Sequence, residues 1–133
     1  RREHVSLVFQ DHNLIDYLTP EENLRLVNPK ADMKSLEDLG LSREESKRNI
    51  MHLSGGQRQR VAVGRALVAP GRAILADEPT GSLDPEMTDE VIDLLRHAAH
   101  QLGKCVIVVT HSKRVADSAD AVYTLRHKKL AKA

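Results

Sequence analysis

The sequence predicts an α/β fold in which helices cover a parallel β-sheet. Four short apolar runs have the composition of buried strands, and they alternate with stretches of helical periodicity. Strands that are separated by helices pair in parallel, and the helices then lie on the sheet. A longer segment between the first two runs has little β-propensity, which indicates a helical insertion. The four runs are 5–9, 73–77, 105–111 and 121–125.

Capping signals predict the helices of the insertion. The tetrapeptide TPEE at 19–22 combines a capping box with a proline in the first helical turn, and its helix should end before the Asn-Pro pair at 28–29. The tetrapeptide SREE at 42–45 repeats the capping box. The region from 19 to about 51 is therefore predicted to be mainly helical.

Three further helices are predicted in the C-terminal half. The helix over about 55–68 ends at the Ala-Pro-Gly tripeptide 69–71. Asp84-Pro85 provides an N-cap and a first-turn proline, and the apolar residues that follow keep helical spacing up to the C-cap Gly103. A short helix with a serine N-cap is predicted over 112–118. These helices alternate with strands, as a parallel sheet requires.

Composition excludes several classes of function. The net charge of +1 gives no overall electrostatic attraction to nucleic acid, and one Phe with two Tyr cannot build a base-stacking platform. No apolar run has the length of a membrane span. The only cysteine, Cys105, excludes an internal disulfide, and its apolar surroundings predict a buried structural thiol. A reducing compartment is expected.

Polar residues follow three of the predicted strands: Gln10 the first, Asp77 and Glu78 the second, and His111 the third. The carboxyl ends of parallel strands meet at one edge of a sheet, where ligands bind. There an aspartate can hold Mg²⁺ beside a nucleotide phosphate, and an adjacent glutamate can polarise an attacking water. An Asp-Glu pair alone would be read as two solvated acids, but the four residues together favour a site.

A small polar turn, Ser54-Gly55-Gly56, lies directly before the helix predicted over 55–68. Such a turn exposes backbone N–H groups at the positive end of the helix dipole, which suits the binding of an anion. The glycines allow close approach of that anion to the backbone.

These motifs resemble the ATP-binding subunit of an ABC transporter over nearly the whole chain. LSGGQ at 53–57 matches the family signature, AILADE at 73–78 matches Walker B with the catalytic glutamate, and SLD at 82–84 matches the D-loop. Gln10 matches the Q-loop glutamine and His111 the H-loop histidine. The wording around these motifs also resembles the subfamily of lipoprotein-releasing, macrolide-export and antimicrobial-peptide export systems.

The resemblance implies a partial RecA-like P-loop NTPase core over 1–10 and 70–133, with an α-helical subdomain over 11–69 that carries the signature. It implies ATP and Mg²⁺ as cofactors, and in-line attack of water on the γ-phosphate. The implied catalytic residues are Glu78, His111 and Gln10, the Mg²⁺ ligands are Asp77 and Gln10, and the nucleotide-binding residues are Ser54, Gly55, Gly56, Gln57 and Asp84.

The resemblance also implies partners. Transmembrane permease subunits would place the chain at the cytoplasmic face of the cell membrane as a peripheral subunit. Two ATPase domains would form a head-to-tail dimer in which the signature turn of one covers the γ-phosphate held by the other. No nucleic-acid partner is expected.

The sequence departs from the family in its first phosphate-binding element. The only Gly-Lys pair, Gly103-Lys104, cannot belong to the Walker A pattern GxxxxGK[ST], because Ala98 stands at its first glycine and Cys105 at its Ser/Thr position. We therefore expect the C-terminal portion of an ATPase subunit, inactive alone. The helical insertion is also short, and His127-Lys128 replaces the family's Asp-Gly turn before the last strand.

A chain without the Walker A loop is also expected to lack the strand that carries this loop. In RecA-like sheets the strand that carries the phosphate loop lies between the strands expected here at 105–109 and 121–125. Without it both have unpaired backbone edges, and each buried unsatisfied group costs about 1–3 kcal/mol. We expect the chain to self-associate through these edges, or to rearrange 121–125 over them.

Two other functions remain open at this point. ABC-type ATPases of DNA repair or chromosome maintenance carry long coiled coils where this chain has a short insertion without heptads. A non-catalytic partner would offer only its signature motif to a complete subunit, but Glu78 and His111 indicate a catalytic parent.

Overall fold

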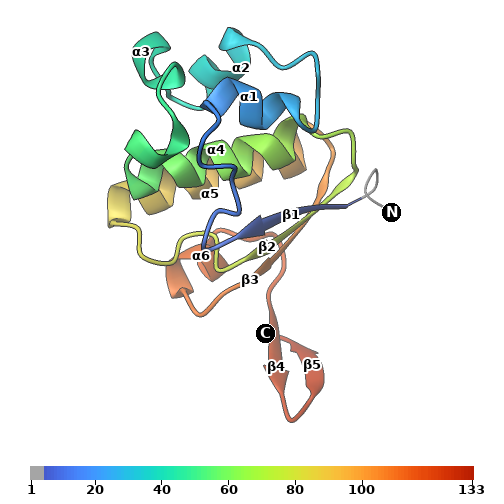
Figure 1. The fold of residues 1–133 in the computed structure, drawn as a ribbon. Coiled ribbons are helices and arrows are strands. Elements are labelled where there is room, and N and C mark those ends of the chain that lie inside the picture. Colours follow the sequence, from blue (N-terminus) through green and yellow to red (C-terminus); the bar gives the residue numbers. More distant parts are fainter. Residues whose placement is uncertain (1–4) are drawn as a thin grey trace.

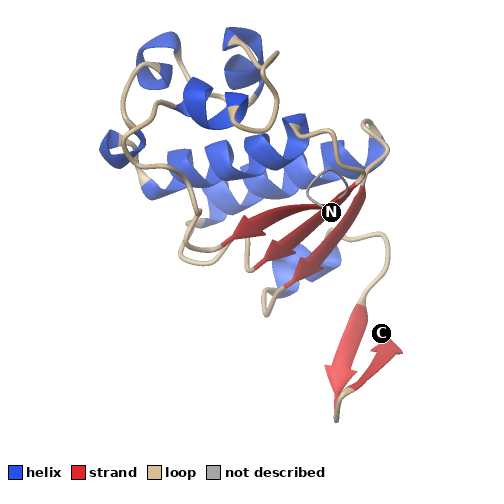
Figure 2. Cartoon of the chain, turned by 45° about the vertical axis from the view of Figure 1, so that its right-hand side comes forward, coloured by secondary structure: helices blue, strands red, loops and turns tan. Residues whose placement is uncertain are grey.

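The computed structural model describes residues 5–133 and contains a three-stranded parallel sheet with helices stacked on one face (Figures 1 and 2). Its strands β1 (Val5–Phe9), β2 (Ala73–Asp77) and β3 (Cys105–Val109) lie side by side in that order. Phe9 is opposite Asp77, which is opposite Val109, so the strands end together. The predicted α/β class and parallel sheet are confirmed. Residues 1–4 of the predicted core lie outside the described residues.

The helices follow the capping signals. Capping boxes begin α1 and α3 at the residues predicted, Thr19 and Ser42, and α4 begins at the predicted Gly55 behind a capping box formed by Ser54. The α5 helix ends slightly before its predicted limit, and Gly103, three residues beyond, has a φ of 66°. The helices are α1 (Pro20–Arg25), α2 (Met33–Asp38), α3 (Arg43–Ser46), the 3-10 turn η1 (Ile50–His52), α4 (Gly55–Val68), α5 (Pro85–His100) and α6 (Lys113–Asp117).

Two apolar clusters hold these elements together. One joins the sheet to α4 and α5, with Val8 and Ile74 packed against Val63 and Val91. The other lies among the helices of the insertion and the opposite side of α4. The α4 helix therefore contributes to both clusters, and Figure 1 shows it between α1–α3 and the sheet.

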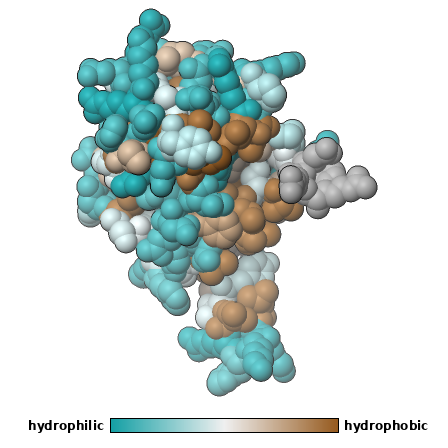
Figure 3. Space-filling model, viewed as in Figure 1, coloured by the Kyte–Doolittle hydropathy of each residue, from teal (hydrophilic) through white to brown (hydrophobic). Residues whose placement is uncertain are grey.

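The opposite face of the same sheet is open. Side chains alternate along a strand, so every second residue faces away from α4 and α5. On this open face Leu7 is 46% exposed, Leu75 39% and Ile107 53%. Hydrophobic side chains gather over this part of the molecule in Figure 3. The predicted burial of Cys105 is wrong, because its side chain belongs to the open face and is exposed.

The C-terminal residues form a separate antiparallel hairpin of β4 (Tyr123–Arg126) and β5 (Lys129–Lys132). Its turn residues His127 and Lys128 have positive φ values of 49° and 64°. Figure 1 shows the hairpin projecting from the helices and the sheet. The alternative that 121–125 covers the edge of β3 is wrong, because within residues 5–133 β4 pairs only with β5. Self-association stays a prediction.

No helix within residues 5–133 combines the length and the apolarity that a membrane crossing needs.

Candidate functional site

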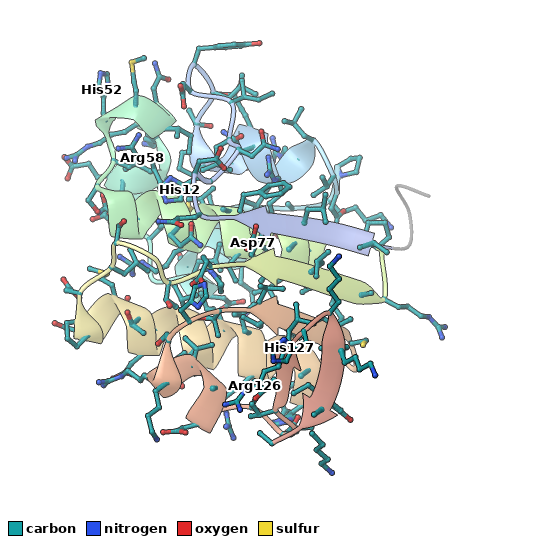
Figure 4. The ribbon with its side chains drawn as sticks, turned by 90° about the horizontal axis from the view of Figure 1, so that it is seen from below. His12, His52, Arg58, Asp77, Arg126 and His127 are labelled. Atoms are coloured by element: carbon teal, nitrogen blue, oxygen red, sulfur yellow. The ribbon has the colours of Figure 1, made fainter. Side chains whose placement is uncertain are left out.

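The structure brings the four predicted polar residues to one edge of the sheet. Gln10 follows β1, Asp77 ends β2 with Glu78 directly after it, and His111 lies two residues beyond β3. The common register of the three strands sets them at the same level. In Figure 4 Asp77 lies where β1 and β2 end.

Glu78 is held from several directions. Its N–H donates to the Val109 carbonyl at 2.8 Å, which continues the pairing of β2 with β3 by one residue. Its Oε1 accepts from the backbone N–H of His111 at 2.9 Å, and its Oε2 accepts from the Thr110 hydroxyl at 3.2 Å. Its φ of 47° lies in the left-handed region, which a residue with a side chain adopts only under constraint. The carboxylate is thereby oriented along the end of β3.

His111 and Thr110 divide two tasks at the end of β3. The His111 side chain is fully exposed, and its Nε2 lies 3.9 Å from Glu78 Oε1. Its ring is therefore accessible to a ligand, while Thr110 orients the carboxylate. The sequence analysis gave Thr110 no role, although a hydroxyl at a strand end beside His111 was the available signal.

Asp77 and Gln10 offer oxygen atoms to a cation. No hydrogen bond or ion pair engages the Asp77 carboxylate in the described part of the chain. Gln10 donates through Nε2 to the Ser82 hydroxyl at 3.4 Å, which leaves its Oε1 available. These are the hard ligands that Mg²⁺ prefers. Residues 5–133 hold no cluster of three or more His, Cys, Asp or Glu suited to a metal.

The loop between β2 and α5 packs closely on Gln10. A Cβ added to Gly81 would lie 2.6 Å from Gln10 Cδ, so a side chain there would displace Gln10. Ser82 has a φ of 70°. The predicted nucleotide-binding residue Asp84 is the N-cap of α5, where its side chain accepts from the Met87 N–H at 2.8 Å.

The signature turn is a capped helix start. Ser54 Oγ accepts from the Gln57 N–H at 3.1 Å, and Gln57 Oε1 accepts from the Ser54 N–H at 2.9 Å. Gln57 also donates to Glu45 at 2.7 Å, so its side chain is fully used within the chain. Ser54 is exposed, and its hydroxyl hydrogen remains free to donate to a ligand.

The two glycines of the turn differ. Nothing lies within 4 Å of a Cβ built on Gly55, so its backbone is open to an approaching anion. A Cβ on Gly56 would meet Met87 Sδ at 2.8 Å, so Gly56 serves the close packing of α4 on α5. Of the predicted phosphate-binding residues, Ser54 and Gly55 are therefore the accessible ones.

A histidine and an arginine meet beside this edge. Burial and the nearby Arg58 guanidinium lower the pKa of His12, and Asp11 opposes them weakly. Figure 4 shows His12 and Arg58 next to each other near the end of β1. Arg58 belongs to α4, the helix that begins at the signature turn (called the signature helix below). This helix therefore reaches the segment that follows Gln10.

A family model described as ABC transporter matches residues 1–81, which is more than half of the chain. This chain belongs to the ABC transporter family. The predicted family is thus confirmed. The matched range of this ABC chain includes Gln10, the signature turn, Asp77 and Glu78, whereas Asp84 and His111 lie beyond it.

Relatives of this ABC chain include ATP-binding proteins and a permease fusion. It is 36% identical over 130 residues to the uncharacterized ABC transporter ATP-binding protein YclH of Bacillus subtilis strain 168, covering 90% of the chain and 58% of YclH. It is 40% identical over 135 residues to the lipoprotein-releasing system ATP-binding protein LolD of Rickettsia prowazekii, with coverage of 93% and 60%. It is 39% identical over 136 residues to the macrolide export ATP-binding/permease protein MacB of Escherichia coli K12, with coverage of 95% and 21%.

A solved ABC cassette, MJ0796, supports the fold of this ABC chain. Its dimeric structure matches with a TM-score of 0.79 at 35% identity, over 92% of this chain and 59% of that one. Its post-hydrolysis state bound to ADP and Pi matches with a TM-score of 0.82 at 32% identity, over 99% and 64%. The predicted cassette architecture is confirmed, and the chain spans about 60% of the length of the ATP-binding proteins that it resembles.

Proposed function

We propose that this chain is the C-terminal portion of an ABC transporter ATPase subunit that couples ATP binding and hydrolysis to transport. One observation carries the proposal: the Glu78 carboxylate is held by Thr110 and His111 beside Asp77 at the common end of three parallel strands. Strand ends of this kind bind ligands in α/β proteins, and a fixed carboxylate can accept a proton from water.

The chain's own residues have separate tasks in this proposal. Glu78 accepts the proton of the water that attacks the γ-phosphate, and the exposed His111 ring donates to a γ-phosphate oxygen. Asp77 and Gln10 present oxygen atoms on the metal side. When bound, Mg²⁺ would neutralise charge on the phosphate oxygens. Thr110 keeps the Glu78 carboxylate in place.

We further propose that Ser54, Gly55, Gly56 and Gln57 form the turn that serves ATP held by a second ATPase domain, with Ser54 and Gly55 in contact with the phosphate and Gly56 and Gln57 shaping the turn. The open backbone at Gly55 and the free hydroxyl hydrogen of Ser54 lie at the start of the 14-residue helix α4, which favours an anion. The dimeric structure of MJ0796 supports a dimer, which we propose to be head to tail. Asp84 would act at the same interface through the loop that it ends.

The division into a core over 1–10 and 70–133 and a helical subdomain over 11–69 is also part of the proposal. The two apolar clusters on opposite sides of α4 support it. Transmembrane permease subunits are the proposed partners, at the cytoplasmic face of the membrane. The name of MacB, which joins ATP-binding and permease functions, supports this choice.

We propose that this 133-residue chain does not hydrolyse ATP by itself. Its sequence holds no GxxxxGK[ST] pattern, whose backbone and lysine hold the phosphates in P-loop proteins. Calorimetry of this chain with Mg·ATP should show no binding at micromolar concentration. Measurable affinity there would contradict the proposal.

Two variants of the full-length protein test the catalytic assignment. Glu78→Gln should retain ATP binding and lose at least a hundredfold in kcat, because an amide cannot accept the proton. Ser54→Arg should retain nucleotide binding by the monomer and abolish the ATP-dependent dimer in gel filtration, because its side chain fills the open turn. If Glu78→Gln hydrolyses ATP at the wild-type rate, Glu78 is not the base. If Ser54→Arg still forms the closed dimer with ATP, the signature turn does not contribute to the partner's site.

A further inference from the structure

Gln59 is a buried amide that the mechanism above does not use. It lies in the second turn of α4 and is only 1% exposed. Its Nε2 donates to the main-chain carbonyl of Pro79, the residue directly after Glu78. Its Oε1 is buried and has no hydrogen-bond partner among the described residues.

The chemistry at Pro79 explains why a donor is needed there. Proline has no N–H, so its carbonyl is the only main-chain group through which Pro79 can form a hydrogen bond. Pro79 is fully buried, and a buried carbonyl needs a partner. An amide oxygen facing that carbonyl would repel it, so the nitrogen of Gln59 must point to Pro79.

The Gln59–Pro79 bond completes the constraints on Glu78. On one side, the N–H and the carboxylate of Glu78 are fixed to the end of β3. On the other side, the bond from Gln59 fixes the Pro79–Thr80 peptide, one peptide unit beyond Glu78. A left-handed φ such as that of Glu78 persists only where the surroundings over-determine it. Gln59 is the constraint that comes from α4.

The bond also links two functional parts that are distant in sequence. The α4 helix begins at the signature turn, and Gln59 connects this helix to the loop that carries Glu78. Gly56 packs on Met87 along the same contact between α4 and α5, so the two helices are close there. A displacement of α4 when the signature turn binds a phosphate would therefore reach Glu78.

We infer that Gln59 is a positioning residue that ties the orientation of Glu78 to the position of the signature helix. The inference rests on the function proposed above for Glu78 and the signature turn. Gln59 itself touches no reacting atom in this assignment. Through Gln59, the orientation of the Glu78 carboxylate, which acts on the ATP bound to its own chain, would depend on the signature turn of that chain. This turn contacts the phosphate of the ATP that the partner holds.

Hydrogen exchange of this 133-residue chain tests the link without nucleotide. The Gly81 N–H bonds to the Glu78 carbonyl at 3.1 Å and reports on the loop, while the Ala116 N–H in α6 is a remote reference. Gln59→Leu should speed exchange at Gly81 at least tenfold and leave Ala116 within twofold. The control Gln57→Leu breaks the cap of α4 and should leave Gly81 within threefold. Equal exchange at Gly81 in Gln59→Leu and wild type overturns the link.

A second variant covers the case in which Gln59→Leu does not fold. Gln59→Glu keeps the shape of the side chain, and its carboxyl group can donate to Pro79 only when protonated. After correction for intrinsic rates, Gly81 should be protected at acidic pH and lose at least tenfold in protection as the pH rises, relative to Ala116. If the ratio of protection at Gly81 to protection at Ala116 does not change with pH and equals the wild-type ratio, the link is overturned.

Kinetics of the full-length protein test the consequence for catalysis. Gln59→Leu should lower kcat at least tenfold with KM for ATP within twofold, because the side chain does not contact the nucleotide. In Gln59→Glu, kcat should fall as pH rises where wild-type kcat does not. An unchanged kcat in folded Gln59→Leu overturns the inference. If wild type itself shows no hydrolysis, the proposed function fails, and the exchange experiment still decides the link.

Discussion

The two faces of the three-stranded sheet are built from the same kinds of residues but have opposite surroundings. On the covered face Val8, Ile74 and Ala76 are at most 1% exposed beneath α4 and α5. On the open face five large apolar residues, Leu7 and Leu75 among them, are 39–55% exposed. Apolar sequence on both faces of a strand is typical of a sheet covered on both sides.

This difference shows that the hydrophobic pattern of a strand indicates which side chains need to be buried. It does not indicate which element or partner molecule covers them. The covered face finds its partner within residues 5–133, whereas the open face has none among them. An exposed apolar patch on a sheet marks a surface that associates with something else. The site lies at the common edge of both faces, where the strand ends are held by hydrogen bonds and not by either layer.

The largest expected effect separates two neighbours in one strand. Ile74→Ala should lower the free energy of unfolding by about 2–5 kcal/mol, because it opens a cavity under α4 and α5 at a fully buried position. Leu75→Ala, on the open face, should cost less than about 1.5 kcal/mol, because its side chain is 39% exposed already. Urea denaturation of both variants measures the two values. Equal losses would mean that the open face is covered in solution.

The sequence predicted most of the elements and the positions of the strand-end residues, because both depend on local signals. Capping boxes placed α1 and α3, a polar turn placed the start of α4, and the order of strands placed Gln10, Asp77 and His111. The exposure of Cys105 could not be predicted, since its apolar run was compatible with burial on both faces. The contact of Gln59 with Pro79 joins residues far apart in sequence, and no local pattern signals it.

A second effect concerns what the open face does in solution. The free edge of β3 and the exposed Ile107 favour association with another copy of the chain. Ile107→Lys should shift self-association to concentrations at least tenfold higher, which corresponds to about 1.4 kcal/mol. Leu125→Lys in the hairpin is the control, because it lies outside the three-stranded sheet.

Light scattering across a dilution series measures this shift. The wild-type mass should exceed 14.8 kDa at high concentration and approach it on dilution. A wild-type mass of 14.8 kDa at every concentration would show that the open face is tolerated by the monomer. A shift as large in Leu125→Lys as in Ile107→Lys would assign the association to the hairpin.

The smallest effect belongs to a group that is only half covered. The exposure of His12 lies between that of the covered and that of the open face of the sheet. Burial together with the charge of Arg58 lowers its pKa from 6.5. The unfolded chain therefore binds a proton more readily than the folded chain. The contribution of His12 to stability is complete above pH 6.5 and is lost as the pH falls through the folded-state pKa.

His12→Asn is the matched variant, because asparagine tolerates the φ of 70° at this position and does not titrate. Urea denaturation at pH 7.5 and pH 5.5 should show a larger loss of stability on acidification in wild type than in His12→Asn. The two proteins are identical at every other position, so the difference isolates His12. Identical losses in the two proteins would show that His12 is fully solvated, and that the segment after β1 does not pack against α4.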